Sequence, residues 1–409
     1  MRIIPSPIIK LSGLFFSLSF IIFNFINRDL SNIAMICLLF VSIYSIIFND
    51  ITLRINNQEK ILIYSFTCFS VLIFAFSAYH SSSLNEVDNY SRFLLLLPIY
   101  FYLRTININS KYLVYTILIS SLVSFSSVLM IYDLTAGNMS IPGRFNPISS
   151  SALTFGNLNM TLFILLLGCW IFRDRLKLSS FLLLLGLFVS FLSWGLTHTK
   201  GSILGLAIVL IYLNVINKSF RVFSLCIVLL GTFIVSSTEL NQRFKVFIND
   251  TILLLHGESV MSENIDLSVR ERVFYYKSAI DIVKNNPLDG IGFDSFESYL
   301  EQKKVDQNLN LSTSDHAHNE FLDIALKTGL IGLSIFLILL INIYKFFNTS
   351  SSKNSKYSFF ECLGKITLLS QIGFMLTQSQ LAHHQSTVFF IILILIFASQ
   401  ITYRKNNIP

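Results

Sequence analysis

The residue types best suited to catalysis gather in residues 315–320, which read Asp-His-Ala-His-Asn-Glu. If a helix begins at Asp315, His318 lies one turn later on the same face, where the carboxylate can orient the imidazole through a hydrogen bond. The N-terminus of a helix also disfavours imidazolium, so we expect a neutral His318 that can accept a proton near pH 7. The spacing therefore predicts His318 as a general base and Asp315 as its partner, with His316 more tolerant of substitution.

Two other interpretations of these residues remain open. His316 and His318 could bind a metal ion together with a carboxylate, although residues two positions apart point about 200° apart around a helix and do not easily share one ion. Alternatively, His318 could make an ordinary structural contact within its own segment.

A second group of candidates precedes this segment. Ser268 and Glu271 have the spacing of a capping box and predict a helix that begins there. Arg270 and Arg272 then lie in its first turn, and Tyr276 follows Arg272 by one turn. The planar guanidinium group suits phosphate because it offers donors to two oxygens at once. Ordinary solvated arginines on an amphipathic helix would give the same pattern.

Lys200 ends the stretch Thr197-His198-Thr199-Lys200, which connects two apolar runs. It could face a phosphate, or its long side chain could simply extend to the lipid headgroups. Arg144 is a weaker candidate for substrate contact. His383 and His384, between the last two apolar runs, are expected at the membrane interface without an assigned role.

The composition shows that lipid surrounds most of the chain. Of the 409 residues, 53% are hydrophobic and 13% are charged, whereas a soluble domain has about 25% charged residues. The net charge of +7 comes from basic residues that stand singly or in small groups between apolar runs. Such residues set membrane topology, and no basic stripe interleaved with aromatic residues predicts nucleic-acid binding. We therefore predict an all-α integral membrane protein that does not bind nucleic acid.

Apolar runs predict about twelve membrane-spanning helices, of which the fourth is short and contains Pro98. They lie near residues 11–27, 31–48, 61–79, 92–103, 112–132, 152–172, 179–195, 201–216, 220–236, 328–346, 361–377 and 385–402. Lysine and arginine concentrate on alternate connections, and the positive-inside rule places these in the cytoplasm. Both termini are then cytoplasmic, and one large periplasmic loop, residues 237–327, separates nine helices in residues 1–236 from three in residues 328–409.

Within this loop the pattern predicts two amphipathic helices. The first begins at the capping box and stops at Asn286-Pro287. A glycine turn, Gly290-Ile291-Gly292, leads to a second helix that begins near Ser314 or Asp315 and continues through Gly329 into the tenth span. Because a long ordered loop in a compact protein is usually functional, we expect the active site here.

Four fragments in this region, taken in order, resemble the O-antigen ligase family, which is related to O-antigen polymerases and to bacterial protein O-oligosaccharyltransferases. They are Arg272-x-x-x-Tyr276, Asn286-Pro287-Leu288-Asp289-Gly290-Ile291-Gly292-Phe293-x-x-Phe296, His316-Ala317-His318-Asn319-Glu320 and Gly329-Leu330-Ile331-Gly332-Leu333. The resemblance implies a GT-C-like helical membrane fold and an inverting, metal-independent glycosyltransferase without a cofactor.

The resemblance also implies roles for individual residues. Arg272 would contact the lipid diphosphate and His318 would activate the acceptor hydroxyl, with Arg270, His316, Asn319 and Tyr276 completing the substrate site. Lys200 stands where the family usually has arginine. A lysine can neutralise a phosphate but cannot clamp two of its oxygens.

The implied reaction transfers O-antigen polysaccharide from undecaprenyl diphosphate to the lipid A–core oligosaccharide, on the periplasmic face of the bacterial inner membrane. An O-antigen polymerase is the main alternative, since it would use the same donor. A lipid-linked sugar transporter or flippase is a more distant one, because its ionisable groups would lie at mid-membrane in two related halves. The sequence has no P-loop or dinucleotide fingerprint, which suits a lipid-linked donor.

Overall fold

The computed structural model describes residues 7–48, 55–134, 151–197, 199–217, 220–221, 245–246, 250, 265–307, 309–348 and 358–407. All the regular elements in these residues are α-helices. The helices before the large loop are α1 (Pro7–Phe23), α2 (Arg28–Phe48), α3 (Asn57–Tyr79), α4 (Leu84–Leu95), α5 (Leu97–Leu103), α6 (Ser110–Leu134), α7 (Ala152–Ile171), α8 (Arg173–Leu176), α9 (Ser180–Leu196) and α10 (Ser202–Ile216). Those in and after it are α13 (Leu267–Asn285), α14 (Ser295–Asp306), α15 (Glu320–Phe346), α16 (Ser358–Met375) and α17 (His384–Asn407).

Six of these helices are long and apolar enough to cross a membrane, namely α2, α3, α6, α7, α15 and α17. The apolar helices α1, α9 and α10 are shorter. The predicted all-α, multi-pass membrane character is therefore confirmed. The number of twelve spans and the GT-C-like fold remain predictions, and nearly all of the predicted span 220–236 lies outside the described residues, as does Arg144.

The predicted fourth span, residues 92–103, is wrong as a single helix. Two helices, α4 and α5, meet at Leu96 instead, and Pro98 lies in the first turn of α5. Proline fits the first turn of a helix because the amide hydrogen that it lacks would have no partner there. The same proline inside one continuous helix would remove a hydrogen bond, so the chain breaks just before it.

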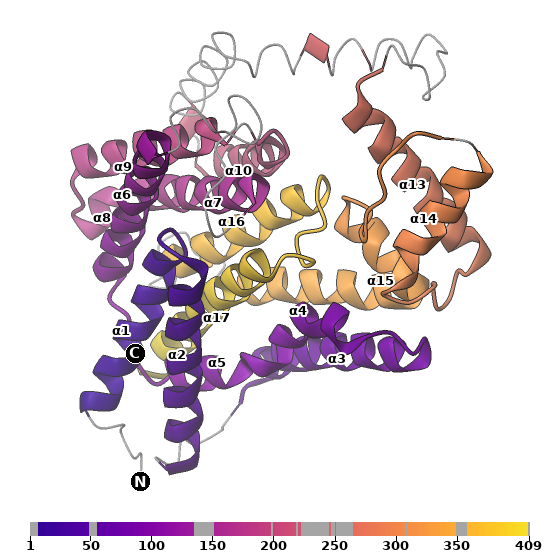
Figure 1. The fold of residues 1–409 in the computed structure, drawn as a ribbon. Helices are drawn as coiled ribbons and strands as arrows, with labels where there is room; N and C mark the ends of the chain where they lie inside the picture. Colours follow the sequence, from indigo (N-terminus) through magenta and orange to yellow (C-terminus); the bar gives the residue numbers. More distant parts are fainter. Residues whose placement is uncertain are drawn as a thin grey trace.

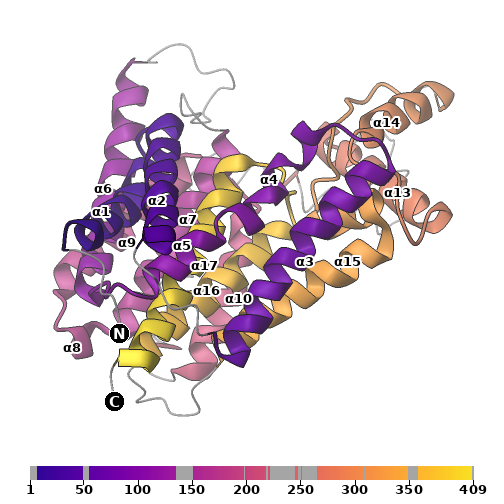
Figure 2. The same cartoon turned by 90° about the horizontal axis from the view of Figure 1, so that it is seen from below.

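The bundle is organised around α7 and α17, which are buried on almost every side. α7 packs against α9 and α16, and α17 packs against α5 and α16. Figures 1 and 2 show α15 lying beside α3 along one flank of this bundle. A helix that is hydrophobic all round belongs in the centre of a bundle, so the order of the helices follows from their composition.

We call one unit of the structure the head. It consists of α13, α14, residue 307 and residues 309–319, and it lies at the N-terminal end of α15 (Figure 1). It has a small hydrophobic core of its own. The core residues are Phe274, Tyr275, Ala279, Ile282, Phe296, Leu300, Leu311, Ala317 and Leu326. Because Leu326 belongs to α15, this core joins the head directly to a helix of the bundle.

The start of α13 differs from the prediction, because the capping box of Ser268 and Glu271 does not form. Asp266 is the N-cap, and its carboxylate accepts a hydrogen bond of 2.9 Å from the Ser268 amide. The Glu271 carboxylate instead accepts hydrogen bonds from the Ser312 amide and hydroxyl. The end of α13 at Asn285, just before Pro287, is as predicted, whereas α14 was not anticipated.

The second loop helix begins five residues later than predicted. Asn319 is the N-cap of α15, and its side-chain oxygen accepts hydrogen bonds of 3.0 and 3.1 Å from the Phe321 and Leu322 amides. The helix continues past Gly329 into the apolar segment, as predicted, but it kinks there because Gly329 has a φ of +66°. A side chain at Gly329 would collide with the backbone of Leu288, so this position requires glycine.

Candidate active site

His318 lies in an irregular segment before α15 and not on a helix, so its predicted relation to Asp315 is wrong. Its φ of +53° is rare for a residue other than glycine. The hydrogen-bond partner of the Asp315 carboxylate is His316 and not His318, since the carboxylate accepts a hydrogen bond from Nδ1 of His316. The ring of His316 in turn lies against that of His318, with the centroids 4.5 Å apart. The backbone thus places His316 between Asp315 and His318.

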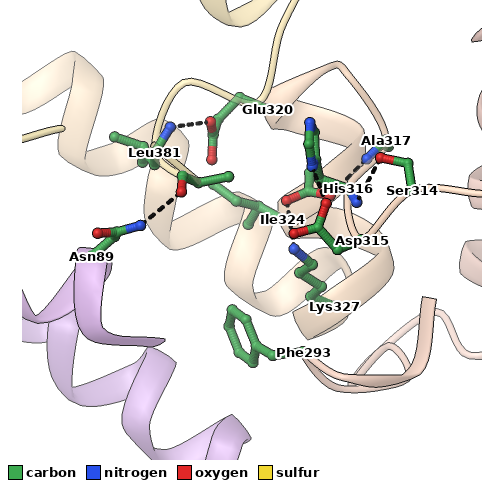
Figure 3. A network of polar contacts seen from close by, with 12 residues as sticks. Asn89, Phe293, Ser314, Asp315, His316, Ala317, Glu320, Ile324, Lys327 and Leu381 are labelled. Atoms are coloured by element: carbon green, nitrogen blue, oxygen red, sulfur yellow. Dashed lines mark hydrogen bonds and ion pairs between the residues drawn. The ribbon is translucent and has the colours of Figure 1, made fainter. Parts of the chain in front are cut away.

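A buried ion pair at the start of α15 holds this segment in place (Figure 3). Oδ1 of Asp323 accepts a hydrogen bond of 2.9 Å from the backbone amide of Ala317. Oδ2 of the same carboxylate accepts one of 2.8 Å from Nζ of Lys327, and both side chains are buried. A buried charge requires a partner, so Lys327 fixes the carboxylate that fixes the backbone between the two histidines.

A second connection ties α15 to residues 376–383, which join α16 to α17. Oε2 of the fully buried Glu320 accepts a hydrogen bond of 2.7 Å from the Leu381 amide (Figure 3). The side-chain amide of Asn319 donates one of 3.0 Å to the carbonyl of Leu376. The connection between the last two helices therefore helps to shape the candidate site, for which the sequence predicted residues of the large loop and Lys200.

His383 also belongs to this cluster, although no role was predicted for it. Its ring centroid lies 5.7 Å from that of His316, and its Nε2 is 2.8 Å from the amide nitrogen of Gln378. Burial lowers the pKa of His383 to about 4. One signal in the sequence could have predicted a role for His383. Several glutamines stand beside His383 and His384 in a connection between apolar helices, and such polar side chains are seldom left facing lipid.

The environment of His318 strongly favours the neutral imidazole. Burial is the largest cause, and the neighbouring His316, Arg272 and His383 add to it, so the pKa of His318 falls to about 3. Asp315 acts in the opposite direction. The hydrogen bond from His316 holds the pKa of Asp315 well below its usual range. At neutral pH the site therefore contains an ionised carboxylate and an unprotonated His318.

Helix α13 supplies the other wall of the site. The ring of Tyr275 stacks on His318 with the centroids 5.8 Å apart, and the Tyr276 hydroxyl donates a hydrogen bond of 3.3 Å to the His318 carbonyl. Arg272 is exposed and lies close enough to lower the pKa of His318. Arg270 is half-buried, and its Nε has no hydrogen-bond partner among the described residues. The structure thus brings Arg272, Tyr276 and His318 together.

Lys200 lies in the connection between α9 and α10, outside the head. The Thr199 hydroxyl donates a hydrogen bond of 3.1 Å to the carbonyl of Ala152, which anchors the stretch before Lys200 on α7. Gly201 packs directly against Thr377 of the connection between α16 and α17. Lys200 therefore lies beside the connection that also contacts Asn319 and Glu320. His198 lies outside the described residues.

His316 and His318 do not lie on a helix, and their rings touch. The angle between two such side chains around a helix therefore does not exclude a shared metal ion. Within the described ranges, however, no three His, Cys, Asp or Glu side chains are arranged to hold a metal ion. What the site does offer is a half-buried neutral imidazole beside exposed positive charge. That combination can accept a proton and stabilise an anionic leaving group.

A model of the O-antigen ligase family matches residues 185–337 of the chain. This match over part of the chain supports an assignment to the O-antigen ligase family. The matched residues include every candidate named above from Lys200 to Asn319. An uncharacterized protein of Haemophilus influenzae is 23% identical over 354 residues, which cover 83% of this chain and 86% of that protein.

The match supports a ligase-type or polymerase-type function in general, and the family implies a membrane environment and lipid-linked saccharide substrates. The match ends at Leu337, before the connection that carries Gln378 and His383. The contribution of the last two helices to the site is therefore an observation of the structure alone.

Proposed function

We propose that this member of the O-antigen ligase family transfers O-antigen polysaccharide from undecaprenyl diphosphate to the lipid A–core oligosaccharide. The reaction would take place on the periplasmic face of the inner membrane. The observation that supports it best is the pairing of a neutral, half-buried His318 with the exposed Arg272 on the adjacent helix. Together they offer a proton acceptor and a phosphate-binding cation.

In the proposed reaction, His318 accepts the proton of the acceptor hydroxyl as that oxygen attacks the anomeric carbon of the donor sugar. The bond between this carbon and the diphosphate oxygen breaks, and the diphosphate leaves with the electron pair. Attack from the face opposite the leaving group inverts the configuration at carbon. Arg272 stabilises the negative charge that develops on the leaving oxygens, and Lys200 adds a second positive charge.

The low pKa of His318 suits this reaction, although such an imidazole is a weak base in the empty site. The diphosphate brings negative charge close to Arg272, and this charge offsets the repulsion that disfavours imidazolium. Donor binding thereby raises the pKa of His318. The base becomes stronger only when the substrate is in place.

We assign His316 to positioning His318. Nδ1 of His316 is engaged by Asp315, whereas Nε2 of His316 and Nδ1 of His318 are both buried without a hydrogen-bond partner in the described part of the chain. With the rings in contact, a small rotation lets Nδ1–H of His318 donate to Nε2 of His316. That bond leaves Nε2 of His318 free to accept the proton.

Deletion of the gene distinguishes a ligase from a polymerase, which share the donor. Without a ligase, the lipid A–core stays bare while polymerised O-antigen accumulates on undecaprenyl diphosphate. Without a polymerase, the core still receives single repeat units. We expect bare core with the polymer retained on the carrier lipid, seen by electrophoresis of lipopolysaccharide and mass spectrometry of the carrier fraction. A core capped by one repeat would favour the polymerase.

A further inference from the structure

The surface of the head carries a groove that the reaction centre does not use. One cavity of about 430 Å³ lies between α13 and α14, and a second of about 720 Å³ lies between α14, the Gly290 turn and the end of α3. Tyr299 and Gln302 line both cavities. The two cavities are therefore parts of one depression, which we call the head groove. Both cavities have the size of small-molecule sites, about 300–1,000 Å³.

The charges in the head groove argue against a phosphate ligand. Asp281, Asp289 and Asp306 offset the lysines that line it. The ammonium of Lys303 is engaged by Asp281 at 2.7 Å and lies 5.6 Å from the centroid of the Tyr299 ring. A diphosphate would face carboxylates here, with no surplus of positive charge to compensate.

The side chains also argue against an acyl chain. Ile291 is the one aliphatic side chain among the described residues that line the head groove. The rest are amides, hydroxyls, charged groups and the rings of Tyr79 and Tyr299. Amides and carboxylates offer donors and acceptors in the numbers that a polyhydroxylated ligand needs. A tyrosine ring offers a flat apolar face for the C–H side of a pyranose.

We propose that the head groove binds a saccharide, with the ring of Tyr299 packing on one sugar and the Gln302 amide bonding its hydroxyls. The saccharide is a segment of the donor polysaccharide or of the acceptor core, so the proposal rests on the proposed function. Both substrates contain several sugars beyond the reacting one. Contacts to remote parts of a substrate supply binding energy that helps to orient the reacting atoms.

The floor of the head groove is joined rigidly to the reaction centre. The backbone amide of Ile291 donates a hydrogen bond of 2.9 Å to the carbonyl of Leu326. The backbone amide of Gly292 donates one of 3.1 Å to the backbone carbonyl of Lys327. Lys327 is the residue that pairs with Asp323 beneath the two histidines. A sugar chain held in the head groove therefore keeps a fixed position relative to His318.

Saccharide binding to the full chain in lipid nanodiscs tests the proposal. The probes are O-polysaccharide and core oligosaccharide, each released by mild acid from the host's lipopolysaccharide, and the readout is saturation-transfer NMR. We expect one of the two to bind, identifying which substrate occupies the head groove. Tyr299→Ala and Gln302→Ala should each weaken binding by about tenfold, while Tyr299→Phe, which keeps the ring, stays within about twofold. Val305→Ala is the control, because Val305 is exposed on the same helix but lines neither cavity.

The same titration in the His318→Ala background separates the two proposals, since binding at the head groove does not require the proposed base. Binding that persists there and is lost in Gln302→Ala supports the head groove, even if the deletion strain shows that the transfer reaction was assigned wrongly. Absence of binding by both saccharides would overturn it. Unchanged affinity in both Tyr299→Ala and Gln302→Ala would do the same.

Discussion

The protonation state of His318 results from three effects of different kinds. Burial removes water that would solvate imidazolium, and the neighbouring His316, His383 and Arg272 repel its charge. Asp315 would favour the charge, but its carboxylate is hydrogen-bonded to His316. The net result is a pKa near 3, so a change in the charge around this ring is the main way in which substrate can control it.

The pH dependence of transfer should show this control. The neutral base is present above its pKa and is lost as the pH falls through it. Because kcat/KM reports the free enzyme, and the pKa of His318 is about 3 there, we expect kcat/KM to be level between about pH 5 and about pH 8. The acid limb of kcat, which reports the donor complex, should lie at higher pH than that of kcat/KM. Coinciding limbs near 6.5 would show that His318 is not the base.

The proposed role of His316 predicts an effect on turnover without an effect on binding. His316→Ala removes the acceptor for Nδ1–H of His318 and should lower kcat by about 10²-fold or more, with KM nearly unchanged. Asp315→Asn should give a smaller loss, since it still accepts a hydrogen bond from His316. His384→Ala is the matched control, because its ring contacts Asn32 and not the site. Full turnover in His316→Ala would show that His316 does not position His318 and tolerates substitution, as the sequence suggested.

At the scale of elements, the first two turns of α15 act as a support for the irregular segment before them. Asp323 performs two tasks, because one carboxylate oxygen holds the Ala317 amide and the other holds Lys327. Removing one partner of a buried pair costs about 3–5 kcal/mol, whereas replacing both by apolar residues is often neutral. This difference allows the structural task to be separated from the positioning task.

Two double variants make that separation. Asp323→Leu with Lys327→Met removes both charges and also the acceptor for Ala317, so we expect normal membrane abundance but transfer reduced by at least about tenfold. Asp323→Asn with Lys327→Met removes the charges but keeps a side-chain oxygen for the Ala317 amide, and should retain most of the activity. Abundance by immunoblot and transfer rate are measured together. Equal activity in the two variants would show that the Ala317 hydrogen bond does not position the histidines.

These elements also show where sequence patterns stop being informative. The end of α13 before Pro287 was predictable, because proline restricts the backbone locally. The continuation of α15 past Gly329 was predictable from the apolar run that follows it. The true N-caps, Asp266 and Asn319, were missed, since several acceptable capping residues stand near each helix start. Helix α14 was missed because its apolar face covers only a small core. Whether this segment forms a helix depends on its contacts with α13, which the local sequence does not show.

At the scale of the whole molecule, composition was sufficient for an all-α membrane protein, because lipid as solvent leaves few alternatives to helices. The position of residues 376–383 beneath the head was not predictable. It depends on how α16 and α17 pack, and no local pattern specifies long-range packing. For this reason the neighbours of His316 were not predicted, and the contribution of His383 was overlooked.

The arrangement of charged residues in space bears on the orientation in the membrane. The guanidinium of Arg404, near the end of α17, donates a hydrogen bond of 2.9 Å to Ser110 at the start of α6, and Lys405 bonds Gln58 at the start of α3. The head joins the opposite end of α3, where His80 meets the Asp289 carbonyl. Figure 2 shows the end of α17, which carries Arg404 and Lys405, at the end of the bundle away from the head. By the positive-inside rule, we expect that end in the cytoplasm and the head in the periplasm.

Labelling of single cysteines tests this orientation. In a variant that lacks the five native cysteines but remains active, Asn310→Cys places a thiol on the exposed surface of the head, and Asp174→Cys places one on α8, where the native side chain is 87% exposed. An impermeant maleimide should label Asn310→Cys in intact spheroplasts and Asp174→Cys only after permeabilisation. Both donor and acceptor of the proposed reaction lie on the periplasmic face, so labelling of Asp174→Cys alone in intact cells would place His318 on the wrong side of the membrane. The transfer mechanism would then be untenable, whereas saccharide binding by the head groove would still stand on its own measurement.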